Sequence, residues 1–530
     1  MGRRAVLLAL AAGGLSGCNP SVADYCASGT PECTPADGGA GPDGAGGSEA
    51  SPDVGGCDPS KSPSEEACVV AETYGVFVSP AGSDSNTGTR SAPVATLGHG
   101  MDVAKATGKR VYVCAGSFGE ELVIGASRDG VNVYGGLDCA GWTYGAGNRV
   151  VVAPLGSGYA LELEGLQTGV TLEDLEFDSQ SAPSPGASSI AAFASNSQNV
   201  VLERVTLVAG TAADGSPAAT SGAGADAGAT NWFGTPPAYP ELNGASASDA
   251  GAAPLTTCTC RDQASSTGGA GSGPNNVPPP TAGLPSYGDA GAGVPGVSGN
   301  QCNSQGGGSN GLDAPVATTG TTSTTLGSCS VSGWTPAAGV AGADGPPGQG
   351  GGGGGDGKVQ SGVGGGGACG GCGGAGGMPG TGGGSSIALL AYQSRLTLVD
   401  CLLTAKAAGS GGIGGSGEQG QGGGGSGYPL GNLPASGCPG GAGGAGAGGN
   451  GGQGGAGGLS LGIGYCGAAP TVDGAVVSGA ASLGGVTLGS AGAGAAGGSG
   501  GAAATNSTDP AGANGASGPA GVAMAVRSLP

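Results

Sequence analysis

The chain has 530 residues, of which 129 are Gly and 35 are Pro, and aromatic residues make up only 4%. This composition is typical of low-complexity sequence and excludes a single conventional core that spans the whole chain. The formal net charge is −21, and few basic residues follow Val205: Arg261, Lys358, Arg395, Lys406 and Arg527. Because no basic stripe is present to neutralise phosphates, we expect no nucleic-acid partner.

Residues 1–18, MGRRAVLLALAAGGLSGC, have the pattern of an export signal, in which Arg3 and Arg4 precede an apolar run too short to span a bilayer. The run ends in Leu-Ser-Gly-Cys, which resembles the lipobox of bacterial lipoproteins. This resemblance implies that Cys18 becomes the N-terminus and carries a diacylglyceryl group. The alternative is an ordinary signal peptide that contains a Cys. We expect a protein of the bacterial cell envelope, on the outer membrane or cell surface, whose partner is the membrane that holds its lipid anchor.

Residues 19–73 form a tether rich in Pro, Gly and Cys. Export implies an oxidising compartment, so its cysteines are expected in disulfides. Cys26 with Cys33 and Cys57 with Cys68 would each close a small loop.

Residues 74–144 hold the most consistent local signals. They predict a strand at 76–80, a polar turn at 83–91 and a helix at 94–107, in which Leu97, Met101 and Ala104 share one face. Three short β-rich runs follow, at 110–114, 121–124 and 130–134, with turns too short for a crossover helix. The pattern indicates a solenoid. Stacked coils lie about 4.8 Å apart, which suits a disulfide between Cys114 and Cys139, and Cys401 is the expected free thiol.

An internal repeat appears farther along the chain. Residues 189–207 (SIAAF, then NVVLERVTL) return at 386–403 (SIALL, then RLTLVDCLL), with a fainter third copy at 460–477. The predicted divisions are coils at 74–210, 385–407 and 459–488, Gly/Ala-rich insertions at 211–384, 408–458 and 489–521, and a C-terminal strand at 522–530.

The Gly-rich insertions allow two interpretations. Stretches such as residues 440–458 (GGAGGAGAGGNGGQGGAGG) have a near-triplet rhythm. Gly loses the most entropy on ordering, which favours disorder. Extended helices related to polyproline II would instead use Gly for close backbone contact. Both remain open, and strict Gly-X-Y with abundant Pro is absent, which excludes collagen. Since loop closure costs little, the insertions are expected to be expendable for folding.

The stretch FVSPAGSDSNTGTRSAP, the helix after it, VYVCAGSFGEELVI and VYGG resemble the first coil of right-handed parallel β-helix proteins of the pectate-lyase type. With the glycine content and the lipobox, the chain resembles glycine-rich bacterial lipoproteins of the myxobacterial type that are similar to PE-PGRS proteins. The resemblance implies an all-β fold: a single-stranded right-handed parallel β-helix with an N-terminal capping helix and long Gly/Ala-rich insertions. It implies no ligand.

Few residues suggest chemistry. His99, the single histidine, lies in the predicted helix and is expected to be a surface or capping residue. Asp84 and Asn86 resemble the start of a Ca²⁺ loop but also suit an ordinary turn, so they are only a weak metal candidate. Cys369 and Cys372 have zinc-ribbon spacing without a second pair, so we expect either a local disulfide or a link to another loop.

No catalytic residue and no cofactor are predicted. We expect a surface protein with a structural or binding, adhesin-like role toward polysaccharide or other cell-surface components. The alternative is a polysaccharide-active lyase or hydrolase on the same fold. Its site would need convergent carboxylates and a basic residue, for which the candidates are Asp174, Asp178, Arg204, Arg395 and Asp400.

Overall fold

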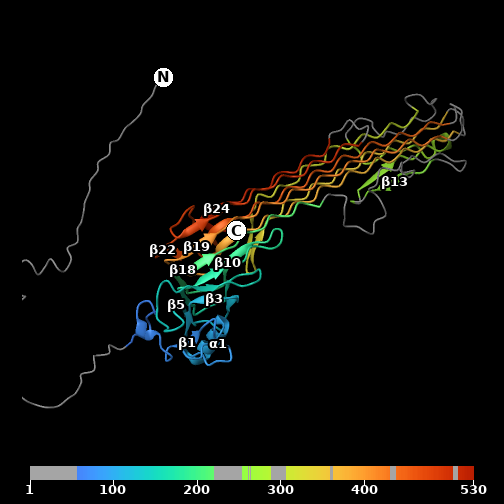
Figure 1. Ribbon diagram of the computed structural model, residues 1–530. Coiled ribbons are helices and arrows are strands. Elements are labelled where there is room, and N and C mark those ends of the chain that lie inside the picture. Colours follow the sequence, from blue (N-terminus) through green and yellow to red (C-terminus); the bar gives the residue numbers. More distant parts are fainter. Residues whose placement is uncertain are drawn as a thin grey trace, which may run out of the picture. The chain divides into compact units, whose positions relative to one another are not determined.

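The structure is a computed structural model. It describes residues 57–219, 253–260, 262, 264–287, 306–357, 362–429, 437–504 and 511–530. The expected signal peptide, most of the tether, and Cys18, Cys26 and Cys33 lie outside this part of the chain. The described residues all belong to one compact unit, Cys57–Pro530 (Figure 1).

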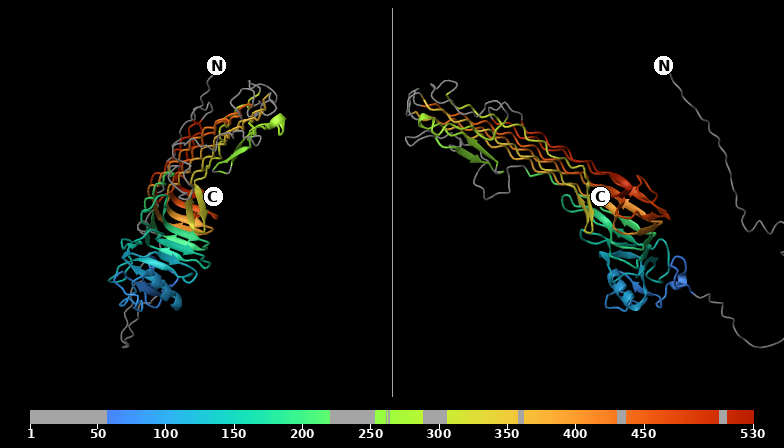
Figure 2. Two further views of the ribbon diagram at one scale, coloured as in Figure 1. Left: turned by 90° about the vertical axis from the view of Figure 1, so that its right-hand side faces the viewer. Right: turned by 180° about the vertical axis from the view of Figure 1, so that it is seen from behind.

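The chain visits three sheets in rotation, and almost all of their strand pairs are parallel (Figures 1 and 2). The eight-stranded sheet contains, in spatial order, β1 (Gly75–Val78), β2 (Arg110–Cys114), β5 (Val133–Leu137), β8 (Thr171–Glu173), β11 (Val200–Glu203), β18 (Leu396–Val399), β21 (Thr471–Val472) and β22 (Ala475–Val476). One six-stranded sheet contains β24 (Ala523–Ser528), β20 (Ser460–Cys466), β17 (Ser386–Tyr392), β10 (Ser189–Ser195), β7 (Leu161–Glu164) and β4 (Leu122–Ile124). The other contains β23 (Val486–Leu488), β19 (Leu402–Ala405), β12 (Thr206–Val208), β9 (Glu176–Asp178), β6 (Val150–Val152) and β3 (Gly116–Phe118).

The predicted fold class, a single-stranded right-handed parallel β-helix, is wrong. The described strands form several multi-stranded sheets, and the largest mixes parallel pairs with the antiparallel pair β21–β22. Two separate antiparallel hairpins join β13 (Thr256–Thr259) to β14 (Ser265–Gly268) and β15 (Gly327–Ser330) to β16 (Gly333–Pro336). The physical reason is local turn chemistry: Asp473 and Gly474 both have positive φ, at 47° and 80°, which closes a tight hairpin and reverses the chain.

One α-helix, α1 (Leu97–Thr107), is present among the described residues, within the range that the sequence predicts. Thr96 caps its N-terminus by accepting a hydrogen bond from the N–H of His99, and Gly108, with φ of 66°, ends it in the left-handed conformation. Leu97, Met101 and Ala104 are buried against the first strands. The helix therefore covers the apolar start of the sheets.

The three copies of the internal repeat pair directly with one another. Ser189 of β10 lies beside Ser386 of β17, which lies beside Ser460 of β20, and the register continues along the strands. Their alternating apolar side chains, such as Leu389 and Ile463, enter a core that the three sheets share. The insertions between the copies therefore leave the sheets and return in register.

The Gly-rich segments are packed against one another rather than left as separate loops (Figure 2). Segment 362–385 donates to segment 437–458 from every third residue, and the same offset of 73 positions holds throughout. These donor–acceptor pairs are Gly365–Cys438, Ala368–Gly441, Gly371–Gly444, Gly374–Ala447, Gly377–Asn450, Gly380–Gln453 and Gly383–Ala456. A three-residue period with bonds between segments fits the polyproline II-like interpretation. We call this assembly the glycine lattice.

Segment 437–458 lies at the centre of the glycine lattice. It exchanges backbone hydrogen bonds with six neighbours: residues 306–314, 337–357, 362–385, 406–428, 489–504 and 511–522. A Cβ on Gly452 would lie 2.1 Å from the carbonyl oxygen of Met378, and one on Gly443 would lie 1.8 Å from that of Cys369. Such distances exclude any side chain, so glycine is required by the close approach of the segments.

Candidate functional site

In the eight-stranded sheet, each of four strands is followed directly by a turn residue with positive φ. These residues are Asp174 (56°), Arg204 (51°), Asp400 (50°) and Asp473 (47°). Strands β8, β11, β18 and β21 are neighbours in that order, so the four turns follow one another along the sheet. The structure thereby gives three of the candidate catalytic residues equivalent positions on adjacent strands.

Arg204 is the centre of a charged cluster. Its Nε and Nη2 donate to the two carboxylate oxygens of Asp174, each at 3.0 Å. Its guanidinium also pairs with the carboxylates of Glu173 and Glu203. Glu173 is only 2% exposed, whereas the Arg204 side chain is 30% exposed. Three carboxylates thus converge on one cation, the type of arrangement that the enzyme alternative requires.

The electrostatics of this cluster favour a closed ion-pair network. Burial raises the pKa of Glu173, although hydrogen bonding to Ser64 and the charge of Arg204 act in the opposite direction. Burial lowers the pKa of Arg204, but the hydrogen bond to Asp174 and the charge of Glu173 outweigh it and raise the pKa overall. Arg204 therefore stays protonated, and it is not available as a base.

Ser64 covers the cluster from outside the sheet. Its hydroxyl donates to Glu173 Oε1 at 2.9 Å and accepts from Arg204 Nη2 at 2.9 Å. Arg110 holds the same covering loop, residues 57–70, by donating to the carbonyl oxygens of Pro59 and Lys61. The cluster therefore fastens this loop to the sheet, which is a structural task.

The remaining candidates do not join this cluster. Asp178 lies on β9 in a different sheet, where burial raises its pKa. Its Oδ1 is buried without a hydrogen-bond partner among the described residues. The backbone N–H of Arg395 donates to Ser197, and that of Asp400 donates to the Asp473 carboxylate.

Asp84 and Asn86 hold a turn together. Asp84 accepts hydrogen bonds from the N–H groups of Ala95 and Thr96, at 2.8 and 3.0 Å, and from the Thr96 hydroxyl at 2.9 Å. The Asn86 amide donates to the carbonyl oxygen of Pro93 at 2.9 Å. These contacts fix the entry to α1 and explain both residues without a metal ion.

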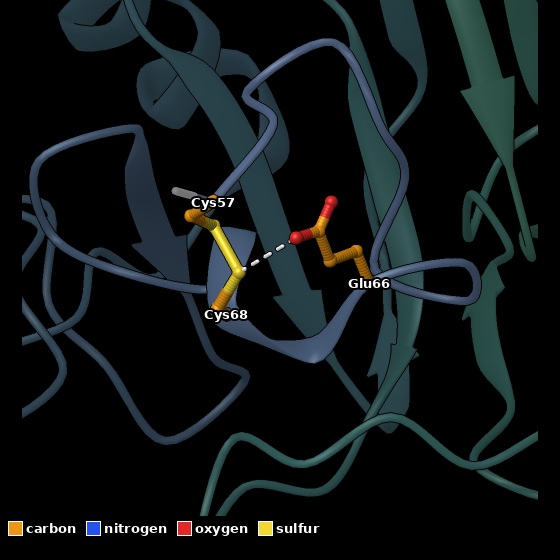
Figure 3. Close-up of side chains that lie close together, drawn as sticks. All are labelled: Cys57, Glu66 and Cys68. Carbon is orange, nitrogen blue, oxygen red and sulfur yellow. Dashed lines mark hydrogen bonds between the residues drawn. A yellow bond between two sulfur atoms is a disulfide. The ribbon is translucent and has the colours of Figure 1, made fainter. Parts of the chain in front are cut away.

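Cys57, Glu66 and Cys68 are close enough together to be considered as metal ligands (Figure 3). The two sulfur atoms, however, form a disulfide, and Glu66 Oε1 lies 3.2 Å from Cys68 Sγ. A metal binds the thiolate form of Cys, which a disulfide cannot supply. The group is therefore a disulfide with a neighbouring carboxylate.

The described cysteines are otherwise paired, apart from Cys401. Besides Cys57–Cys68, the structure contains Cys114–Cys139, Cys258–Cys369, Cys260–Cys372 and Cys329–Cys466. Cys369 and Cys372 thus bind the hairpin β13–β14 to the glycine lattice. Cys401 Sγ donates to the carbonyl oxygen of Leu202 at 3.3 Å, and burial raises its pKa to about 11. Its thiol is only partly buried, and it remains protonated at neutral pH.

Sequence reasoning missed Glu173 and Glu203, although each directly precedes a candidate on adjacent strands. An acidic residue repeated before the turn residue was the signal that could have found them. Comparison with protein families, curated proteins and solved structures finds no match for this chain. Among the described residues, no helix has both the length and the apolar character needed to cross a membrane.

Proposed function

We propose that this chain is an exported, lipid-anchored surface protein with a structural or binding, adhesin-like role. The observation that carries the proposal is the glycine lattice, in which backbone hydrogen bonds recur at every third residue along each segment. At about 3.1 Å per residue, the paired stretch from Gly365 to Ser386 measures roughly 65 Å. Close packing on several sides and two disulfides to the hairpin β13–β14 make this a stiff element, as a surface protein needs.

The charge distribution supports a role without catalysis. The carboxylates around Arg204 are engaged by that one cation, and Ser64 covers them. The ionisable groups contribute to the attachment of residues 57–70, which belong to the predicted tether, to the sheets. A partner would be polysaccharide or another cell-surface component, and the membrane would be engaged only through the lipid on Cys18.

The test is Cys18→Ser in the full chain, followed by separation of membrane and soluble fractions. Each buried methylene of an acyl chain contributes about 0.8 kcal/mol, so loss of the lipid should move the protein into the soluble envelope fraction. Cys401→Ser is the matched control, because it removes the described free thiol and leaves the lipobox intact. Membrane partition that is unchanged in Cys18→Ser would contradict the lipid anchor.

Degradation of pectin, alginate and similar polysaccharides by the full chain should be undetectable. Activity that disappears in both Asp174→Ala and Arg204→Ala, with the sheets still folded, would contradict the proposal and support a polysaccharide-active enzyme.

A further inference from the structure

One segment of the glycine lattice departs from it. Residues 306–314 follow segment 437–458, with Gly308, Gly311 and Ala314 donating to Pro439, Ala442 and Ala445. Beyond this point the pattern stops, and residues 318–322 are all exposed. The side chains of Asn450 and Gln453 extend from the central segment to this part of the chain.

Two buried side-chain amides hold residues 318–323 at both ends. Asn450 Nδ2 donates to the carbonyl oxygen of Thr318 at 2.9 Å. Gln453 accepts from the N–H of Ser323 and donates to its carbonyl oxygen, both at 2.8 Å. Asn450 and Gln453 are each only 4% exposed. The four residues between these anchors, Thr319–Gly320–Thr321–Thr322, form an arch.

The arch lies over a cavity of about 230 Å³ that the central segment, residues 340–342 and residues 513–516 also line. The hydroxyls of Thr319, Thr321 and Thr322 have no hydrogen-bond partner in the part of the chain that the structure describes. Its backbone has no regular strand partner either. The hydroxyls are therefore exposed on a chain that an enzyme could bind in extended form.

The sequence around the arch is also rich in hydroxyl side chains and has no charged residues. Residues 314–343 contain no charged side chain, and they include a run of eight residues, Thr-Thr-Gly-Thr-Thr-Ser-Thr-Thr, shortly after Pro315. Hydroxyl-rich stretches with Pro are typical of O-glycosylated stalks on exported proteins. Neither packing nor electrostatics accounts for three exposed β-branched residues at this position.

We propose that the threonines of the arch are O-glycosylation sites, an inference that relies on export. In the reaction, Thr Oγ1 would attack the anomeric carbon of a sugar carried by a polyprenyl phosphate or a nucleotide. The new bond joins Oγ1 to that carbon, the bond from the carbon to the phosphate oxygen breaks, and the phosphate leaves. The hydroxyl proton passes to a base of the transferase. The glycan would cover the cavity and the neighbouring lattice.

The test uses the full chain purified from the membranes of the organism that makes it. After reduction, cleavage before Asp313 and Asp344 releases one peptide that contains the whole arch. Its mass should exceed the sequence mass by whole sugar residues. Replacing Thr319, Thr321 and Thr322 together by Val, which keeps the shape but removes the hydroxyls, should abolish this increase. Replacement of all three by Ser should retain it.

The outcomes separate this inference from the proposed function. An unmodified peptide in protein recovered from the envelope overturns the glycosylation and leaves the surface role intact. A mass increase that survives in the Val variant also overturns it, since the sugar must then lie elsewhere in the peptide. If the chain is not exported, the proposed function fails. An unmodified peptide from that non-exported protein overturns the glycosylation as well.

Discussion

The identity of single residues in the glycine lattice reports which neighbours they have. Along the central segment, every third residue from Gly440 to Gly458 is glycine, because segment 362–385 runs beside the whole stretch. The position before each of these glycines is Pro439, Ala442 and Ala445 at first and changes to glycine at Gly448. A Cβ at Gly448 would lie 2.3 Å from the carbonyl oxygen of Gly501. Glycine therefore appears where segment 489–504 begins to pack.

Glycine replacements should consequently differ in sign. Gly452→Ala would place its Cβ 2.1 Å from a backbone oxygen, and we expect it to destabilise the lattice by about 3 kcal/mol through overpacking. At Gly422 a Cβ would meet nothing within 4 Å, so Gly422→Ala should be neutral or stabilising by about 0.5 kcal/mol. Urea unfolding of both variants measures the difference, and equal midpoints would contradict close packing at Gly452.

The Arg204 cluster predicts a pH-dependent effect. Arg204→Met leaves Glu173 buried without its cation, which raises the pKa of that carboxyl further above its ordinary value. Because Arg204 is partly exposed, we expect a loss of about 1–3 kcal/mol at neutral pH, below the range for fully buried pairs.

The sign follows from proton binding. Between the ordinary carboxyl pKa and the raised one, the folded variant binds more protons than the unfolded chain, so its stability rises as pH falls. The deficit relative to the parent protein should shrink toward acidic pH, as measured by urea unfolding. Adding Glu173→Gln should recover part of the loss at neutral pH, and a deficit that is independent of pH would rule out this explanation.

At the level of elements, disulfides hold the hairpin β13–β14 on the glycine lattice. Cys258 of β13 and Cys260, directly after that strand, bind Cys369 and Cys372, which are one triplet apart. Cysteines two residues apart, the repeat of a strand, are thus bonded to cysteines three residues apart, the repeat of the lattice. The sequence showed Cys369 and Cys372 as a pair, but their partners depend on packing between distant segments.

Removing both bonds should open the hairpin locally. With all four of these cysteines changed to Ser, we expect a local loss of about 2–4 kcal/mol per bond, or less where the two constraints overlap. The amides of Thr267 and Gly269, which donate to Leu284 and Gly351, should exchange faster. Hydrogen exchange of β10 and β17 should not change. Cys57→Ser with Cys68→Ser is the control, and equal acceleration there would contradict a local effect.

The sequence predicted α1 and many of the short strands because the residues that determine each of these elements lie close together in the chain. Thr96 and Gly108 at the ends of α1 and the apolar face between them suffice for the helix. The repeat also predicted which distant strands are related. The sheet arrangement was wrong because the turn at Asp473–Gly474 and the isolated hairpins depend on pairing choices that short apolar runs leave open. The closed cluster at Arg204 depends likewise on Ser64, which is 140 positions away.

At the scale of the whole molecule, the Gly-rich segments depend on one another. The expectation that they are expendable came from the low cost of closing long loops, which ignores the hydrogen bonds that they make. Segment 362–385 donates to 437–458 and accepts from 406–428, so its removal deprives both of a neighbour. The sheets, by contrast, have their own core.

Replacing residues 215–380 by a short Gly/Ser linker should therefore affect the sheets and the glycine lattice differently. We expect the sheets to retain cooperative melting, because β10 and β17 lie outside the deletion. Amides at Gly412, Gly415 and Gly443 should lose protection from hydrogen exchange, since neighbouring segments are removed or freed. The control is the full-length chain in which only the exposed residues 318–322 are changed to Gly/Ser. Protection unchanged by the deletion would mean that the remaining segments pack on their own.

The glycine lattice also has a thermal consequence. Unfolding exposes peptide groups there rather than apolar side chains, and exposure of polar surface lowers the heat capacity, whereas apolar exposure raises it. The heat-capacity increment per residue of lattice should therefore fall below the usual value of about 12–15 cal/mol/K. A small increment flattens the dependence of free energy on temperature, so the lattice should gain little from the hydrophobic effect and lose little of its stability in the cold.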